Sequence, residues 1–165
     1  MNWRQFGNRA VIWLLHSPAR LLLSASTLAL TVTGRRSGAV YTIPVNYVMR
    51  GREALVISPR THIWWKNLIE GAPVTAYLQG QCVRFVGFAI TEPDVVADGL
   101  LKFLRRSSRY QRSLAVPLDE RGAPQRWEDL IRVASHYALI CLTPIETVTE
   151  ALTGEEARHG ASVHT

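Results

Sequence analysis

A short basic loop between two strand-like runs is the segment of this chain best suited to bind an anion. Residues 34–38 read GRRSG and join the apolar runs 28–33 and 40–48. Glycine at both ends lets the backbone adopt the positive φ that a tight hairpin requires. The two guanidinium groups, the hydroxyl and a run of free backbone N–H groups would together receive a phosphate or a carboxylate. The other interpretation is a solvated hairpin tip without a ligand.

The distribution of charge also points to an anionic partner. Residues 1–52 contain seven arginines and no Asp or Glu, in a chain whose formal net charge is +6. Such an asymmetry favours a membrane surface, a nucleic acid or a polyanionic cofactor. Nucleic acid is the least favoured of the three, because the basic residues do not belong to a recognisable DNA- or RNA-binding motif.

Motifs for chemistry without an organic cofactor are absent from the sequence. It contains no nucleophile elbow, P-loop, dinucleotide fingerprint or HExxH zinc motif. Ser58 has no base near it in the sequence, so hydrolysis by an activated serine is not expected. The five histidines and two cysteines show no metal-ligand spacing, and no metal site is predicted. What remains suits a protein whose bound cofactor carries the chemistry.

Cysteine usage and hydropathy predict a cytoplasmic protein. Cys82 and Cys141 lie in apolar strand-like runs, which indicates buried, reduced thiols. The longest apolar stretch, residues 10–32, is interrupted by a histidine, a proline and an arginine and is not expected to span a bilayer.

Residues 1–27 are predicted to form an N-terminal amphipathic helical segment, because Trp3, Phe6 and Trp13 share one broad face. This face would either lid the rest of the fold or lie in a membrane interface. In the second case residues 1–24 would contact anionic lipid at the inner face of the cell membrane. The oligomeric state stays open, with a homodimer among the alternatives.

The remaining chain alternates between strand and helix patterns. Runs at 28–33, 39–49, 54–58, 74–79, 82–91 and 137–142 predict strands, with a hairpin about residues 80–81. A short helix capped by Thr61 is expected to end at Gly71. A helix of about twenty residues should begin at residue 92, and a shorter one should cover 125–135.

These elements predict an α+β fold: a mainly antiparallel barrel with N-terminal and flanking helices. One barrel domain is expected over residues 28–145 of the 165. Periodicity is lost from Thr143 onward, and 146–165 are predicted to be a flexible tail.

Four short motifs in a fixed order add a family resemblance. They are TVTGRRSG, a strand with a proline, a strand ending in a serine, and WWKNL followed by Pro-Val. Their order resembles the deazaflavin-dependent nitroreductases, which are coenzyme F420-dependent reductases on a split β-barrel. The resemblance covers about residues 28–90 and not the last twenty. The matching residues are Gly34, Arg36, Ser37, Gly38, Pro44, Ser58, Trp64, Asn67 and Leu68.

The resemblance implies a split β-barrel that binds coenzyme F420 and reduces a quinone-like or nitro-aromatic acceptor. Arg36 and Ser37, with Arg35, would then hold the phosphate and glutamyl tail. The family's basic residue after the hairpin is replaced here by Tyr41 or Thr42, and Arg60 is the candidate for the missing positive charge.

The same resemblance implies a ring pocket and a catalytic set. Pro44, Ser58 and the segment from Trp64 to Asn67 would shape the pocket for the deazaflavin ring. Asn46 and Ser58 would donate hydrogen bonds as charge builds on the acceptor, with Tyr110 on the substrate side. Packing of the barrel core is the alternative for the tryptophans, and bonding to a neighbouring loop is the alternative for Asn67.

Two other functions remain open at this point. The barrel could hold flavin mononucleotide (FMN), which carries one phosphate and needs less positive charge. Alternatively, the chain could be a cofactor-binding, membrane-associated module without turnover. The family's glycine-rich loop is shortened here to residues 59–63, which favours the non-catalytic interpretation.

Overall fold

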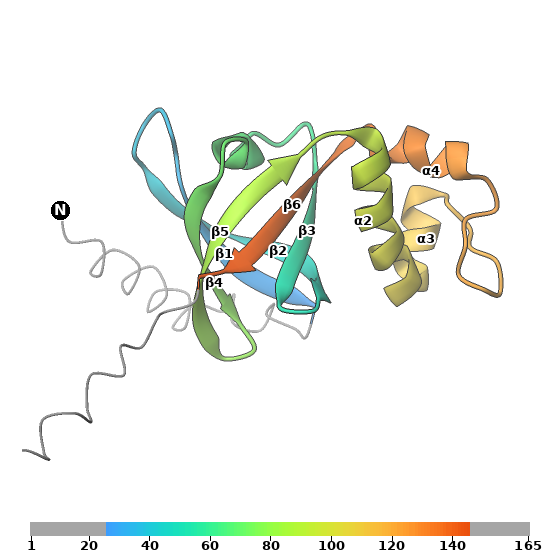
Figure 1. Cartoon of the computed structure of the whole chain (residues 1–165), viewed down its shortest axis with the longest axis horizontal. Helices are drawn as coiled ribbons and strands as arrows, with labels where there is room; N and C mark the ends of the chain where they lie inside the picture. Colours follow the sequence, from blue (N-terminus) through green and yellow to red (C-terminus); the bar gives the residue numbers. More distant parts are fainter. Residues whose placement is uncertain (1–25, 146–165) are drawn as a thin grey trace, which may run out of the picture.

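The computed structural model describes residues 26–145 and shows a closed, antiparallel six-stranded barrel flanked by helices (Figure 1). The predicted α+β split-barrel fold is confirmed. The predictions for residues 1–24 and for the tail 146–165 lie outside the described residues. The strands are β1 (Thr27–Thr33), β2 (Val40–Arg50), β3 (Glu53–Pro59), β4 (Ala72–Leu78), β5 (Gln81–Ile90) and β6 (Tyr137–Pro144).

Strand alternation divides the apolar residues into two cores. In β3, Ala54 and Val56 belong to the cluster inside the barrel, whereas Leu55 packs in a second cluster with the helices. Because successive side chains of a strand point to opposite faces, both faces of β3 are buried. The same alternation in β6 directs Ile140 inward and Leu139 toward the helices.

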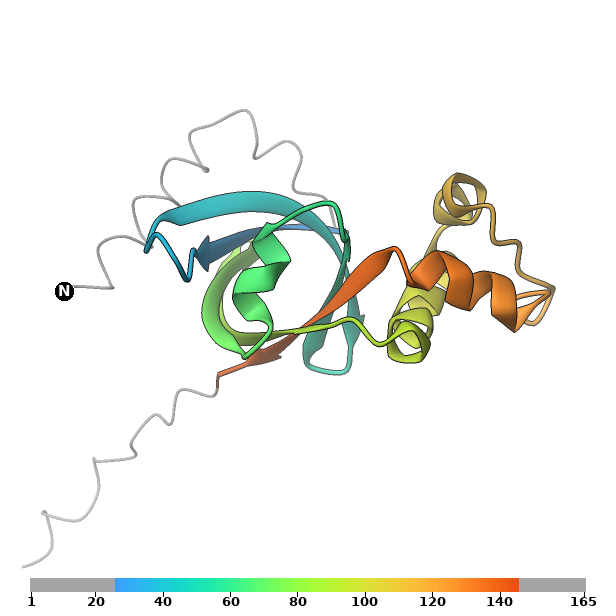
Figure 2. The ribbon, with the colours of Figure 1, turned by 90° about the horizontal axis from the view of Figure 1, so that it is seen from above.

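Three helices pack against one side of the barrel (Figure 1). They are α2 (Pro93–Arg106), α3 (Ser108–Leu114) and α4 (Trp127–Ala134). A one-turn 3-10 helix, η2 (Trp64–Leu68), instead covers one end of the barrel (Figure 2). The GRRSG loop, residues 34–38, lies at that same end.

The strand order is β1-β2-β3-β6-β5-β4, so β6, the last of the described strands, lies between β3 and β5. β2 is the longest of the described strands, and it pairs with β1 over more residues than with β3. Its residues 40–46 pair with β1, whereas it pairs with β3 only from Tyr47↔Val56 to Arg50↔Glu53. The first half of β2 and the end of β3 are therefore not paired with each other. Pro44 lies in the half of β2 that pairs with β1 alone, an edge position that tolerates a residue without an N–H donor.

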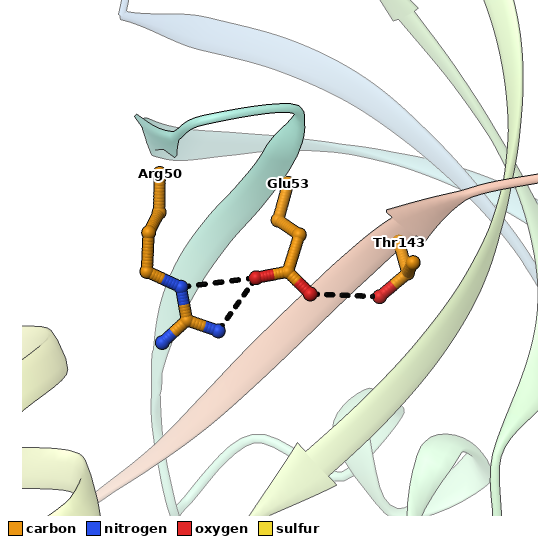
Figure 3. A network of polar contacts seen from close by, with 3 residues as sticks. All are labelled: Arg50, Glu53 and Thr143. Atoms are coloured by element: carbon orange, nitrogen blue, oxygen red, sulfur yellow. Dashed lines mark hydrogen bonds and ion pairs between the residues drawn. The ribbon is translucent and has the colours of Figure 1, made fainter.

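A polar network at the β2–β3 turn joins the two strands to β6 (Figure 3). Arg50 donates from Nε and Nη2 to one carboxylate oxygen of Glu53, at 3.0 and 2.6 Å. The other oxygen of Glu53 accepts from the hydroxyl of Thr143 at 3.1 Å. The predicted end of the last strand at residue 142, with periodicity lost from Thr143, is therefore two residues too early, because Thr143 and Pro144 also belong to β6.

The predicted helix of about twenty residues is two helices, α2 and α3. Ser107 interrupts it in an extended conformation, with φ −150° and ψ 121°. Its hydroxyl oxygen accepts from the backbone N–H of Arg109 at 3.2 Å and so begins the second helix. The predicted Thr61 cap is also wrong, since η2 begins after Ile63 without a side-chain cap.

The β4–β5 hairpin turns at Gln79 and Gly80, one residue earlier than predicted. Both have positive φ, 49° and 82°, which is the type I′ geometry that suits the twist of paired strands. Cys82 lies just after this turn, where it pairs with Tyr77, and it is exposed. Its predicted burial is therefore wrong. Cys141 is buried as expected.

Candidate functional site

A cavity of about 720 Å³ lies where β2 and β3 separate, and it is called the split cavity below. This volume falls within the roughly 300–1,000 Å³ of small-molecule sites. Its walls come from β2, β3, the following loop, η2, α2, α3 and the start of β6. The lining includes five predicted site residues that are far apart in the sequence: Pro44, Asn46, Ser58, Trp64 and Tyr110.

Ser58 is a buried polar residue in the wall of the split cavity. It follows Ala54 and Val56 on the inward face of β3 and is 2% exposed. Its hydroxyl donates to the carbonyl of Pro59 at 3.3 Å, which is long for a hydrogen bond between oxygens. A hydroxyl held this weakly retains the capacity to donate to a ligand in the cavity.

His62 also lines the split cavity, and sequence analysis missed it. The backbone N–H of His62 donates to the carbonyl of Pro59, and this turn brings Nδ1 to 3.5 Å from the Ser58 hydroxyl. A base therefore does lie near Ser58, which the sequence analysis did not expect. Ser58 and His62 are only four residues apart, and the short loop between β3 and η2 keeps them close. This spacing is the sequence signal that could have revealed the pair.

The Ser58–His62 pair does not have the geometry of an activated nucleophile. A separation of 3.5 Å exceeds a well-formed hydrogen bond, and within residues 26–145 no carboxylate bonds to the imidazole. The pair supplies polar groups to the cavity wall rather than a hydrolytic triad.

Asn46 and Tyr110 form a second polar group in the split cavity. The carbonyl oxygen of Asn46 accepts from the Thr27 hydroxyl at 3.0 Å. Burial raises the pKa of Tyr110, while a hydrogen bond from Asn46 and the charge of Arg109 lower it in part. The ring is held edge-to-face against Phe103, with centroids 5.7 Å apart. Tyr110 is therefore a neutral, oriented phenol at physiological pH.

Trp64 joins the barrel core to the cavity wall. It is 9% exposed, packs in the interior cluster and lines the split cavity from η2. Trp65 is buried in the core and does not line the split cavity. Pro44 and Trp64 thus present rigid apolar surfaces to the cavity. For Trp65, the alternative interpretation of packing in the barrel core is the correct one.

Asn67 does not line the split cavity, although the resemblance placed it there. Its side chain instead connects η2 to the GRRSG loop. The Asn67 carbonyl oxygen accepts from the backbone N–H of Arg35 at 2.9 Å. Its amide donates to the hydroxyl of Tyr41 at 2.8 Å and to the carbonyl of Trp64 at 2.9 Å. The alternative assignment, a residue bonding to a neighbouring loop, describes it correctly.

The GRRSG loop has fewer free donors than predicted. The backbone N–H groups of Gly34, Arg35, Gly38 and Ala39 are all bonded within the protein. The guanidinium of Arg35 pairs with Glu70 at 2.5 Å, and the Ser37 hydroxyl accepts from Ala39. Arg36 is exposed and has no ion pair within the described residues. It is the loop's uncompensated cation.

Arg60 holds strands together at the end of the barrel. Its Nε donates to the carbonyl of Tyr137 at 3.0 Å, and its Nη2 donates to the carbonyl of Thr91. Its backbone N–H donates to the carbonyl of His136 at 2.9 Å. The guanidinium is thus directed at the junction of β3, β5 and β6, and it does not line the split cavity as a replacement cation would.

Neither metal ligation nor a membrane-spanning helix is found in the described part of the chain. No three His, Cys, Asp or Glu side chains gather there as a metal site requires. No helix there is both long and apolar enough to cross a bilayer.

No protein-family model and no curated protein matches this chain. Among solved structures, a candidate 5-nitroimidazole antibiotic resistance protein from Bacteroides thetaiotaomicron aligns with 12% identity and a TM-score of 0.51, over 78% of each chain. A protein of unknown function from Agrobacterium tumefaciens aligns with 18% identity and a TM-score of 0.50, over 75% of this chain and 50% of its own.

An F420 reductase also aligns, with 12% identity over 77% of this chain and 92% of its own. Its TM-score of 0.45 is too low to support an assignment. The first two matches show that the fold of this chain is known from solved structures of bacterial proteins. At identities this low a shared fold carries no information about activity.

Proposed function

We propose that this chain is an oxidoreductase that binds a flavin-type cofactor in the split cavity, and that the cofactor is the deazaflavin coenzyme F420. The observation that carries the proposal is the convergence of Pro44, Asn46, Ser58, Trp64 and Tyr110 on one cavity of about 720 Å³. A cavity with rigid apolar walls and a few polar groups is the usual setting for a planar organic ligand.

The donor set fits a planar ring with an anionic tail. Trp64 and Pro44 offer flat apolar surface, and Arg36 lies beyond η2 on the GRRSG loop. Both ends of such a ligand therefore find suitable groups at the η2 end of the barrel. When bound, the cofactor would supply a hydride for a quinone-like or nitro-aromatic acceptor.

The protein's own part is to bind, orient and donate hydrogen bonds. Ser58, Asn46 and Tyr110 place three neutral donors around the cavity. A hydroxyl or amide that faces an acceptor oxygen stabilises the negative charge that grows there during reduction. Tyr110 is suited to donate because burial raises its pKa and keeps the phenol protonated.

FMN is the second candidate, and the Arg35–Glu70 ion pair favours it. This pair compensates one of the two loop arginines, which leaves Arg36 as the cation for an anionic tail. One cation matches a single phosphate better than it matches a phosphate with several glutamyl carboxylates.

Direct titration decides between the two cofactors. The purified full-length protein is titrated with coenzyme F420 and with FMN, using the fluorescence of each cofactor. Saturable binding of F420 with weaker binding of FMN is expected. The reverse order would transfer the proposal to FMN, and failure of both to bind would refute it.

Arg36→Ala tests the tail-binding role of the loop. Removal of a charge-assisted contact costs about 1.5–3 kcal/mol, which corresponds to a roughly tenfold or greater loss of cofactor affinity. Arg84→Ala removes an exposed arginine from β5 and is the matched control for net charge. If both variants bind equally well, the GRRSG loop does not hold the cofactor.

A further inference from the structure

A second cavity, of about 730 Å³, adjoins the split cavity and differs from it in chemistry. It lies between the start of β1, the middle of β2 and the junction of α2 with α3. We call it the polar cavity. Phe103, Tyr110, Asn46 and Ser113 line both cavities, so the two spaces meet at these side chains.

The polar cavity is positively charged. Arg106 and Arg109 line it, together with the hydroxyl-bearing Ser107 and Ser113, and none of the described residues in its lining is a carboxylate. Among residues 26–145, no arginine lines the split cavity. Tyr110 lines both cavities, and the positive charge of the neighbouring Arg109 lowers the pKa of Tyr110 in part. The positive charge of Arg109 therefore acts where the two cavities meet.

The polar cavity lies at the opposite end of β2 from the GRRSG loop. From Val40, beside the loop, to Asn46 is six residues, or about 20 Å along a strand at ~3.3 Å per residue. A cofactor anchored at Arg36 with its ring against Trp64 would extend along this first half of β2. The part of the polar cavity lined by Tyr47, Arg106 and Arg109 would then lie beyond the path of this cofactor.

We propose that the polar cavity binds an anionic substituent, a carboxylate or a phosphate, of the acceptor whose ring lies in the split cavity. Arg109 and Arg106 supply the charge, and Tyr110 and Asn46 mark the boundary that the substituent crosses. The substrate class is thus an aromatic or quinone-like acceptor with a negatively charged side group. This inference rests on the proposed function for the identity of the ring.

The test compares an anionic acceptor with its neutral isostere. Binding of 4-nitrobenzoate and of 4-nitrobenzamide to the full-length protein is measured without cofactor by ligand-observed NMR titration. Their KM values are then measured with reduced coenzyme F420. The variant is Arg109→Gln, alone and combined with Arg106→Gln, and the control is Arg112→Gln, an exposed arginine of α3 that lines neither cavity.

The parent protein should bind the carboxylate more tightly than the amide. Arg109→Gln should reduce this preference about tenfold, as expected for the loss of a charge-assisted contact, and Arg112→Gln should retain it. The preference should also fall with added salt. Equal affinity for both compounds in the parent, or an equal loss in the Arg112 control, overturns the inference.

The two proposals fail in different measurements. If F420 and FMN do not bind but the carboxylate preference persists in the titration, the proposed function fails and the anion site stands. If turnover occurs without any preference for the carboxylate, the anion site fails and the proposed function stands. Absence of binding by either nitro compound also overturns the anion site.

Discussion

Ser58 combines burial with poor hydrogen bonding, and this combination is expected to matter during turnover. Its hydroxyl has partners only at 3.3 and 3.5 Å within the described structure. Ser58→Ala should slow acceptor reduction by roughly ten- to a hundredfold, because a donor that acts as charge develops stabilises the transition state. Cofactor affinity should change little. Single-turnover rates and cofactor titration on the same sample measure both effects.

A purely structural Ser58 would behave differently. The variant would then lose melting temperature and keep its rate per folded molecule. Ser135→Ala is a suitable control, since that hydroxyl caps the end of α4 by donating to the carbonyl of Arg132 at 2.7 Å. A catalytic role for Ser58 requires that its variant, and not the control, change the rate.

At the scale of single residues, motif order predicted some of the residues that meet in the split cavity, but not the direction of every polar side chain. Pro44 and Ser58 were predicted from motif order, and both line the split cavity. Asn67 and Arg60 occupy motif-like positions as well, but their side chains point to backbone carbonyls and loop groups. No pattern in the sequence shows which way a polar side chain turns in a short loop.

The GRRSG loop and η2 form a single unit through Asn67. Asn67→Ala removes three hydrogen bonds that join η2 to Arg35 and Tyr41 and fix the turn at Trp64. At about 0.5–1.5 kcal/mol each, their loss should lower the free energy of unfolding by roughly 1.5–4 kcal/mol. Urea denaturation measures this loss, and hydrogen exchange should show faster exchange at the Arg35 amide.

Asn67→Asp separates the two directions of bonding. The carboxylate still accepts from the Arg35 amide but cannot donate to Tyr41 or to the carbonyl of Trp64. It should therefore protect the Arg35 amide while recovering only part of the lost stability. If the Ala and Asp variants exchange equally fast at Arg35, then Asn67 does not hold the loop.

Elements were predicted well where hydrophobic period was the dominant signal. The six strands were expected because alternating apolar residues occur in each, and all six form. The break between α2 and α3 was not expected, because the apolar period continues past Ser107 to Tyr110. A local hydrogen bond from the Arg109 amide to Ser107 outweighs that period.

The whole molecule should lose stability in alkaline solution. Burial raises the pKa of the Cys141 thiol above its ordinary value of 9.0, an effect that the charge of Arg50 offsets in part, and burial also raises the pKa of Tyr110 above 10.0. Above about pH 9 the unfolded chain releases a proton that the folded protein keeps, so folding becomes less favourable. Each retained proton makes stability fall by about 1.4 kcal/mol per pH unit between the two pKa values.

Urea denaturation from pH 7 to pH 10.5 measures this decline. Cys141→Ala should be less stable at pH 7, since it leaves a small cavity, but its stability should fall less steeply above pH 9. Burial also raises the pKa of the Cys82 thiol, but that residue is exposed, so Cys82→Ala should alter the slope less than Cys141→Ala. Parallel slopes for the parent and Cys141→Ala would show that the buried thiol does not control alkaline unfolding.

The position of β6 determines how this barrel can form during synthesis on the ribosome. A nascent chain that has emerged only as far as α4 has β3 and β5 but not the strand that joins them. Their edges would present unpaired backbone groups and the apolar residues that β6 normally covers. Vectorial folding must therefore wait for the final strand, and truncation before Tyr137 should give an aggregating chain rather than a smaller domain.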